Sequence, residues 1–200
     1  MKYFIVLFVF LVQFSFCYSQ VKNSLAEQGI KGNVIELTWR KFIVSGSGSS
    51  AVNKIDTKTI FSYDSLGFLS EQRNFIDEMK VRTTNKFNYN NYGLKIEEHT
   101  FYPDGSLLEK FIYKYDNTGN LIEEIVYNGK DTLKPEMVNK FDPKAKEEPI
   151  NDTDEEKIEA DQTEKITSYD KAGNWLKKTI YMNKVPFAVE EREFTYFIKP

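Results

Sequence analysis

The chain has 200 residues, a formal net charge of −3 and aromatic residues at 15% of its positions. This length suits one domain, and the mild acidity provides no cluster of Lys and Arg of the kind that nucleic acid requires. The single cysteine, Cys17, lies near the start of the chain. The remainder therefore contains no disulfide, and packing and hydrogen bonding must stabilise it.

The chain begins with a segment typical of secretory signal peptides. One lysine precedes an unbroken apolar run, Tyr3 to Val12, and small or polar residues follow. The pattern predicts a signal peptide over residues 1–19 and a mature protein of the periplasm or the extracellular space. The run is too short to span a bilayer, so we expect no transmembrane segment in the mature chain. An outer-membrane lipoprotein modified at Cys17 is the alternative, but the bulky Phe16 stands where a lipobox has a small residue.

Residues 20–31 form an N-terminal arm before the first strand-like segment. Ser24, followed three residues later by Glu27, has the pattern of a capping box. The pattern predicts at most one short turn of helix, and a disordered arm is the other interpretation.

A repeat of 26 residues follows the arm. It is strictest at one tyrosine, one glycine and one terminal aromatic residue per unit, namely Tyr63, Tyr89 and Tyr115; Gly67, Gly93 and Gly119; and Phe75, Phe101 and Tyr127. Looser copies begin at Gly32, Phe141 and Ser168. Three strict copies together with three loose ones indicate an internal structural repeat.

Each unit contains two turn signals. The first is Asp-x-x-Gly or its Asn variant, found at Asp64–Gly67, Asn90–Gly93, Asp116–Gly119 and Asp170–Gly173. Asp or Asn at the first position bonds to the backbone ahead of it, and Gly at the fourth accepts a positive φ. The pattern predicts a type I turn closed by a glycine bulge. The second signal is a glycine-containing hairpin turn at Tyr102–Ser106 and Tyr127–Asp131.

Runs rich in Tyr, Phe, Ile, Val and Thr connect these turns. They predict an all-β domain over residues 32–200, an antiparallel meander of successive β-hairpins with about ten strands. Neither strand face is cleanly apolar, which favours a single curved or spiral repeat sheet; a β-sandwich is the alternative. A flexible Gly/Ser loop at 44–56 and an acidic loop at 147–164 interrupt the rhythm.

The motif Tyr-Asp-x-x-Gly-(Asn)-Leu/Trp resembles that of the YD-repeat family, which is related to the RHS repeats of large bacterial surface and toxin proteins. It occurs at Tyr63–Leu69, Tyr115–Leu121 and Tyr169–Trp175, whereas Tyr89–Leu94 has Asn90 in place of Asp. The last unit looks like that of small secreted RHS-like proteins of Gram-negative bacteria. The resemblance implies an antiparallel sheet that coils or closes into a shell in large members. This chain has too few repeats to imply that it encloses a toxin.

Residues that suggest catalysis have simpler interpretations. His99 is the single histidine, lacks a partner nucleophile, and is replaced by Arg73 and Ile125 in sister repeats. The pairs Glu97-Glu98 and Glu123-Glu124 suggest a glycosidase, but adjacent strand residues point to opposite faces. We therefore predict no catalytic residue, no enzyme activity and no cofactor.

Two acidic patterns suggest other roles. Glu71, Glu97 and Glu123 recur on one strand face, where neighbouring Lys and Arg are expected to form a ladder with them. Asp152–Glu156 has the alternating oxygen ligands of a calcium loop, but Lys157 stands where an EF-hand has glycine. We predict a solvated acidic loop and no metal site, and Ca²⁺ binding there is left open.

The periodic aromatic residues have a structural and a functional interpretation. Tyr63, Tyr89, Tyr115 and Tyr169 are expected to pack in register as a spine of the sheet. The alternative is a stripe of exposed rings that binds a glycan or a partner sheet. Trp39 and Trp175 belong to the terminal units, and we expect them to cap the ends of the sheet.

The sequence thus predicts a secreted, non-enzymatic repeat protein with a binding or structural role at the periplasm or cell surface. Its specific ligand is unknown, and a cell-envelope protein or a glycan is the partner class we expect; nucleic acid is not. The alternative is an immunity or antitoxin-like module that neutralises a secreted toxin through the acidic loop at 147–164. A hydrolase using Glu97, Glu123 and His99 is the third and weakest interpretation.

Overall fold

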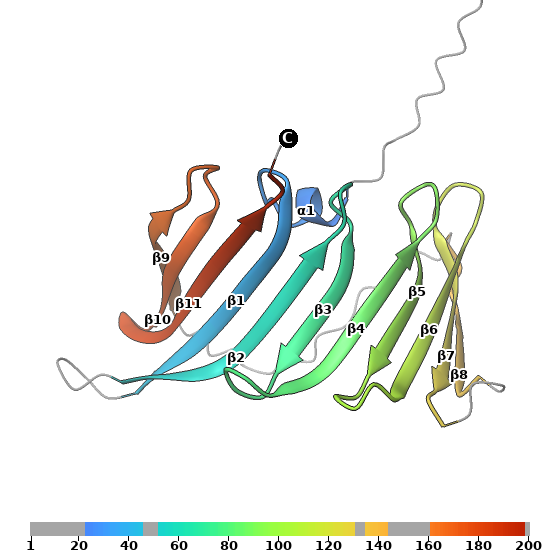
Figure 1. The fold of residues 1–200 in the computed structure, drawn as a ribbon, viewed down its shortest axis with the longest axis horizontal. Helices are drawn as coiled ribbons and strands as arrows, with labels where there is room; N and C mark the ends of the chain where they lie inside the picture. Colours follow the sequence, from blue (N-terminus) through green and yellow to red (C-terminus); the bar gives the residue numbers. More distant parts are fainter. Residues whose placement is uncertain (1–22, 46–51, 131–134, 144–160, 199–200) are drawn as a thin grey trace, which may run out of the picture.

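The computed structural model describes residues 23–45, 52–130, 135–143 and 161–198, which form one antiparallel sheet and one short helix (Figure 1). In chain order the elements are α1 (Ser24–Glu27), β1 (Val34–Ser45), β2 (Val52–Tyr63), β3 (Leu69–Phe75), β4 (Val81–Tyr89), β5 (Lys95–Phe101), β6 (Leu107–Tyr115), β7 (Leu121–Asn128), β8 (Met137–Lys140), β9 (Gln162–Tyr169), β10 (Trp175–Met182) and β11 (Val185–Tyr196). The predicted all-β meander is confirmed, and the sheet has 11 strands.

The order of strands across the sheet is β8-β7-β6-β5-β4-β3-β2-β1-β11-β10-β9. Strands that follow each other in sequence lie side by side, except that β8 and β9 do not pair with each other; instead the first strand, β1, pairs with the last, β11. Both ends of the described chain therefore meet in the middle of the sheet, where the blue and dark red strands of Figure 1 lie side by side. The two edges are β8 and β9, which follow each other in sequence.

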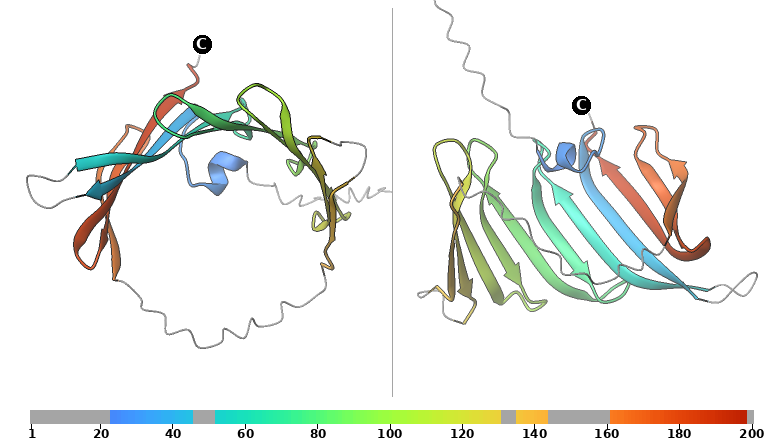
Figure 2. Two further views of the ribbon diagram at one scale, coloured as in Figure 1. Left: turned by 90° about the horizontal axis from the view of Figure 1, so that it is seen from below. Right: turned by 180° about the vertical axis from the view of Figure 1, so that it is seen from behind.

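The sheet bends into an arc, and α1 lies inside it (Figure 2). The strands shift register one residue before Tyr63, Tyr89 and Tyr115, at the ends of β2, β4 and β6. Such bulges bend a strand and increase its twist, and their recurrence along the sheet favours a curved form. All described strands belong to this one sheet, so the β-sandwich alternative is wrong.

The four Asp-x-x-Gly turns share one geometry and lie at the same end of the sheet, the upper end in Figure 1. In one of them, the N–H of Gly119 donates to the carbonyl of Asp116 at 3.1 Å, and the N–H of Asp116 donates to the carbonyl of Asn120 at 2.9 Å. Glycine ends each turn with φ between 81° and 89°. Because an L side chain is strained at this φ, glycine suits the position best.

The apolar core lies between α1 and the middle of the sheet. Its buried members are Leu25, Ile30, Val34, Leu37 and Tyr63. Two of them come from the N-terminal arm, which is therefore part of the domain and not a separate segment. The described part of the arm contains the helix α1, and this agrees with the predicted turn of helix.

Contacts with the β2–β3 turn hold α1 in place. The helix N-cap is Asn23, whose Oδ1 accepts from the N–H of Ala26 at 2.9 Å, so the predicted cap at Ser24 was wrong by one residue. Ser24 instead accepts a hydrogen bond on its Oγ from the N–H of Leu69 at 2.9 Å. The N–H of Leu25 donates to the carbonyl of Gly67 at 3.1 Å.

A buried asparagine fixes the other end of the arm. Asn174 accepts from the N–H of Lys31 at 2.8 Å and donates from Nδ2 to the Lys31 carbonyl at 2.9 Å. The same Nδ2 donates to the Tyr196 hydroxyl at 2.9 Å, and that hydroxyl donates to Asp170. The turn before β10 and the end of β11 are thereby joined to the arm.

Several predicted segments fall partly or wholly beyond this description. The Gly/Ser loop is shorter than the predicted range 44–56, because β1 continues to Ser45 and β2 begins at Val52. The acidic loop, predicted at 147–164, overlaps the start of β9, and its part up to residue 160 lies outside the described residues, as does the signal peptide 1–19. No helix in the described ranges is long and apolar enough to cross a membrane.

Candidate functional site

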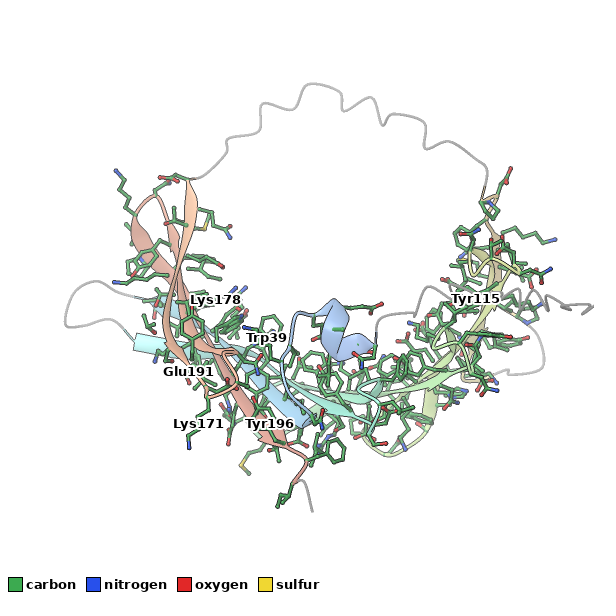
Figure 3. All side chains as sticks on the ribbon, turned by 90° about the horizontal axis from the view of Figure 1, so that it is seen from above. Trp39, Tyr115, Lys171, Lys178, Glu191 and Tyr196 are labelled. Atoms are coloured by element: carbon green, nitrogen blue, oxygen red, sulfur yellow. The ribbon has the colours of Figure 1, made fainter. Side chains whose placement is uncertain are left out.

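The candidate site is the concave face of the sheet, on which α1 lies (Figure 3). Side chains alternate between the two faces of a strand, so the register identifies those that share a face. Leu37 lies under α1, and its row continues across β2, β3, β4 and β5 through Phe61, Gln72, Asn85 and Thr100. The concave face therefore changes from apolar near α1 to amide and hydroxyl groups further along the row.

Asparagine and threonine side chains form a hydrogen-bonded network on this face. Asn85 donates from Nδ2 to Glu98 Oε1 and to Thr100 Oγ1, both at 3.0 Å. Asn74 donates from Nδ2 to Thr83 Oγ1 at 3.1 Å and to Asn85 Oδ1 at 3.3 Å. An amide has two donors and two acceptor lone pairs. Asn74 uses all of them, because its Oδ1 also accepts from Thr59 and Gln72, whereas Asn85 keeps one acceptor lone pair on Oδ1 for solvent or a ligand.

A pocket of about 370 Å³, here called the helix pocket, opens between α1 and strands β4 to β6. Its ring-bearing residues are Phe68, Phe87, Tyr89 and Tyr115. The rings of Phe68 and Tyr89 pack with their centroids 4.9 Å apart. The hydroxyl of Tyr115 donates to the carbonyl of Lys95 at 2.7 Å, which fixes the ring against the pocket wall.

Lys95 also lines the helix pocket, and its charge is balanced. Its Nζ lies 2.7 Å from Glu98 Oε2 and 4.5 Å from the ring centroid of Tyr113. The Tyr113 hydroxyl donates to the same carboxylate at 3.3 Å. Burial raises the pKa of Tyr89 and Tyr115, and burial together with the Glu98 charge raises the pKa of Tyr113. These phenols therefore stay protonated at neutral pH and serve as hydrogen-bond donors.

A second hollow, of about 240 Å³, lies over β1, β2 and β11. We call it the tryptophan hollow; its lining residues are Trp39, Lys41, Thr57, Thr59, Phe61 and Glu190. The rings of Trp39 and Phe61 lie 6.5 Å apart and are tilted by 45°. Figure 3 places Trp39 and Tyr115 on opposite sides of α1, so the helix separates this hollow from the helix pocket.

Arg192 of β11 lies between the two tryptophans. Its guanidinium carbon is 4.5 Å from the ring centroid of Trp39 and 4.0 Å from that of Trp175. The two rings meet edge to face, 5.9 Å apart at 84°. A guanidinium over an indole face is a favourable cation–π contact. The expectation that the tryptophans cap the sheet ends was wrong, because β1, β11 and β10 are adjacent in the interior of the sheet.

The structure separates the repeated tyrosines into two environments. Tyr63, Tyr89 and Tyr115 end β2, β4 and β6 and lie near α1. Tyr63 is 4% exposed and donates to Gln28 Oε1 at 3.2 Å, and burial raises its pKa to about 12. Tyr169 ends β9 at the sheet edge and is 59% exposed, so it does not continue the expected spine.

The glutamate pairs face opposite sides of the sheet. Glu97 lies 3.1 Å from Lys110 on the convex face, whereas Glu98 joins the concave network. Glu123 lies 2.6 Å from Lys114, and its neighbour Glu124 accepts from Asn139 at 3.3 Å. Hydrogen bonds from Asn88 and Lys110 lower the pKa of Glu97, and the bond from Lys114 lowers that of Glu123. Neither pair of adjacent carboxylates can therefore flank one substrate bond.

His99 lies on the convex face beside an aromatic ring and two lysines. The ring of His99 lies 6.2 Å from that of Phe101, and in the strand register it stands between Lys86 and Lys110. Among the described residues no group of three or more His, Cys, Asp or Glu could hold a metal ion. The stretch Asp152–Glu156 lies outside the described residues.

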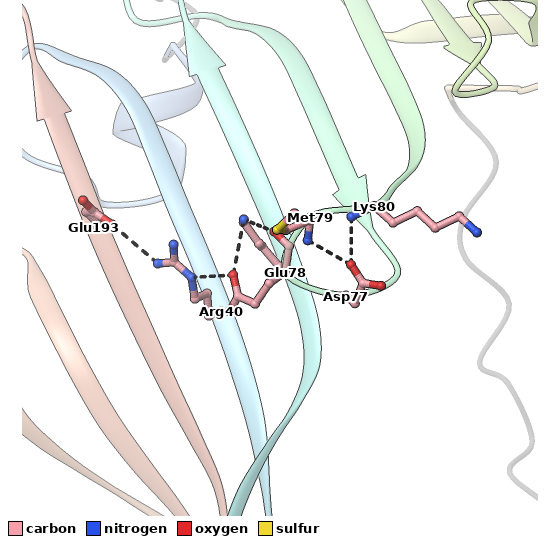
Figure 4. A network of polar contacts seen from close by, with 7 residues as sticks. Arg40, Asp77, Glu78, Met79, Lys80 and Glu193 are labelled. Atoms are coloured by element: carbon pink, nitrogen blue, oxygen red, sulfur yellow. Dashed lines mark hydrogen bonds and ion pairs between the residues drawn. The ribbon is translucent and has the colours of Figure 1, made fainter.

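Ion pairs run across the convex face (Figure 4). Arg40 lies 3.5 Å from both Glu78 and Glu193, and Lys58 lies 3.3 Å from Glu78. Further along the face, Arg73 lies 3.3 Å from Glu71. These pairs agree with the expected charge ladder. Partly exposed pairs of this kind contribute little stability each.

Sequence reasoning did not identify Arg192 or the amide network around Asn85. Arg192 stands between Glu191 and Glu193 in sequence. In the sheet those glutamates point to the convex face, toward Lys177 and Arg40. The period-2 alternation of a strand is the signal that separates them from Arg192.

No protein-family model matches the chain, and no curated protein matches it.

Proposed function

We propose that this chain is a secreted, non-enzymatic binding protein of the YD/RHS-like repeat class, and that it binds a cell-envelope polysaccharide on its concave face. The observation behind this proposal is the presence of aromatic rings together with amide and hydroxyl side chains on one curved surface. A sugar presents an apolar ring face, which stacks on aromatic side chains. Its hydroxyl groups bond to amides and hydroxyls such as those around Asn85.

The layout of the face favours a polymer over a small compound. The helix pocket and the tryptophan hollow lie on the two sides of α1, and each combines rings with polar groups. Ligand sites usually place a few polar groups among apolar and aromatic ones. Two such hollows on one surface suit successive units of a chain. The signal peptide predicted at residues 1–19 would bring the protein to the envelope, where polysaccharides are abundant.

The test is binding of the purified protein to a panel of envelope and plant polysaccharides, measured by affinity electrophoresis and calorimetry. Trp39→Ala and Asn85→Ala should each weaken binding about tenfold, since each removes a stacking or hydrogen-bonding group worth roughly 1.4 kcal/mol. Phe101→Ala, which removes a ring on the convex face, is the matched control and should bind as the unchanged protein does. Circular dichroism verifies that each variant is folded.

The proposal fails if the unchanged protein binds none of the polysaccharides. It also fails if Phe101→Ala weakens binding as much as the two concave variants, because the concave face would then have no special part in recognition.

A further inference from the structure

Arg192 forms no ion pair among the described residues, although Glu190, two positions away on the same strand face, acts on its charge from a longer distance. No carboxylate there lies within ion-pair distance of its guanidinium, and its buried Nε atom has no hydrogen-bond partner. The residue is half-buried, and its contacts are with aromatic rings. Removing a charge from water without a counter-charge costs free energy. Arg192 is therefore an energetic exception that needs an explanation.

The other arginines emphasise this exception. Arg40 contacts Glu78 and Glu193, and Arg73 contacts Glu36 at 3.1 Å. Arg82 is exposed on the convex side of β4, where water screens its charge. Among the described arginines, Arg192 is half-buried and has no carboxylate within ion-pair distance, and it lies on the concave face.

A second cation lies on the other side of Trp39. Lys41 lines the tryptophan hollow and stands opposite Glu190 in the strand register, yet it makes no ion pair among the described residues. Glu190 is approached by Lys178, 3.4 Å away, in an ion-pair contact that lacks hydrogen-bond geometry. Lys178 also lies 3.0 Å from Glu164, so it is shared between two carboxylates. Neither Lys41 nor Arg192 has a carboxylate within ion-pair distance among the described residues, although Glu190 acts on Arg192 from further away.

We infer that the polysaccharide bound by the concave face is acidic, and that a uronic-acid carboxylate binds between Arg192 and Lys41 with its sugar ring against Trp39. This inference rests on the proposed function. A guanidinium presents parallel N–H groups that match the two oxygens of a carboxylate. The two tryptophan rings fix the plane of that guanidinium before the ligand arrives, which lowers the ordering cost of binding.

The net charge of the protein makes this recognition local. The chain has a formal net charge of −3, so a polyanion is not attracted by the molecule as a whole. Attraction must come from the patch around Trp39, where Lys41 and Arg192 lie on one face. Binding is therefore expected to weaken with salt only as much as one or two ion contacts require.

The experiment compares polygalacturonate with the same polymer after its carboxyl groups have been reduced to alcohols. The unchanged full-length mature protein should bind polygalacturonate at least about tenfold more tightly, as expected for charge-assisted hydrogen bonds. Arg192→Gln and Lys41→Gln should each remove most of this preference, so that each variant binds the two polymers with similar affinity. Arg82→Gln, which loses the same charge on the convex face, should keep the preference.

The outcomes separate this inference from the proposed function. Equal binding of the two polymers overturns the inference but leaves polysaccharide binding in place, whereas no binding of any polysaccharide overturns both. Polyglutamate binding as tight as polygalacturonate shows that the sugar ring is not recognised and also overturns the inference. If Arg192→Gln does not fold, Lys41→Gln still tests whether the positive charges of the tryptophan hollow produce the preference for the acidic polymer. Arg192→Lys keeps the charge and tests whether the planar guanidinium is needed.

Discussion

At the scale of single residues, one carboxylate organises each Asp-x-x-Gly turn. Asp116 accepts on Oδ1 from the N–H groups of Thr118 and Asn120, at 2.8 and 2.9 Å, and also from the Thr118 hydroxyl at 2.8 Å. The bonds from Asn120 and Thr118 hold its pKa well below the usual range. In the sister turn, Asn90 makes the same two backbone bonds without a charge, through Tyr92 and Leu94.

This difference predicts an acid dependence of stability. The folded pKa of Asp116 lies below its unfolded value of about 4, so its contribution is fully present above that value and is lost as the pH falls below it. The unfolding temperature should therefore drop between about pH 5 and pH 2, and Asp116→Asn should make the drop shallower. Thermal melts followed by circular dichroism at a series of pH values measure this; an unchanged slope would contradict it.

Gly129, at the turn after β7, is needed because its surroundings leave no room for a side chain. A Cβ there would lie 1.9 Å from the carbonyl oxygen of Leu107, which belongs to the backbone of β6. Gly105 has a positive φ of 83°, but a Cβ there would meet nothing within 4 Å.

We expect Gly129→Ala to lower the free energy of unfolding by roughly 3 kcal/mol, at the upper end of overpacking costs, because the backbone of β6 must move. Gly105→Ala should cost about 1 kcal/mol from backbone conformation alone. Urea denaturation of both variants measures the difference. Similar losses in the two variants would show that β6 yields more easily than its place in the sheet indicates.

At the scale of elements, α1 is stable through tertiary contacts and not through its own four residues. Such a short helix has no stability in isolation. Hydrogen bonds from Leu25 to Gly67 and from Leu69 to Ser24 hold it against the β2–β3 turn. The helix in turn divides the concave face into its two hollows, so the arm that looked peripheral in the sequence determines the shape of the site.

Leu25→Ala should therefore destabilise the whole protein by about 2–4 kcal/mol, as expected for a leucine side chain removed from a core. Glu27→Ala, on the exposed side of α1, is the control and should change stability by less than about 0.5 kcal/mol. Chemical denaturation supplies both values. A small effect of Leu25→Ala would mean that the sheet is stable without the arm.

The elements also show which parts of the structure the sequence reveals. A hairpin turn is made by residues two to four positions apart, so the local sequence pattern of Asp116 and Gly119 is enough to predict it. The meeting of Trp39 with Trp175 depends on the pairing of β1 with β11, for which no nearby residue provides a signal. The sequence therefore predicted a group of aromatic rings, but it predicted neither their position on the concave face nor the presence of Arg192 among them.

At the scale of the whole molecule, the sheet is a meander whose two ends have been joined in its interior. The curved single sheet followed from the repeat and from the mixed faces of its strands. The β1–β11 seam did not, because the meander pattern leaves the first and last strands as edges. In the structure β8 and β9 take those edge positions instead.

A chain that ends at residue 184 and so lacks β11 should fail to fold cooperatively. The truncation removes the partner of both β1 and β10, together with Phe194 and Tyr196, which pack against the core. Far-UV circular dichroism and a urea titration test this expectation. A chain that lacks only residues 197–200, beyond the end of β11, is the control and should unfold in one sharp transition.

The pairing of β1 with β11 also determines when the sheet can be completed during synthesis of the chain. β1 leaves the ribosome first among the strands and β11 last, yet the two must lie side by side. Until synthesis is complete, one side of β1 presents unpaired backbone groups that other nascent strands could capture. The sheet can therefore be completed only after β11 has been synthesised, and until then the exposed side of β1 is a site at which the chain could aggregate.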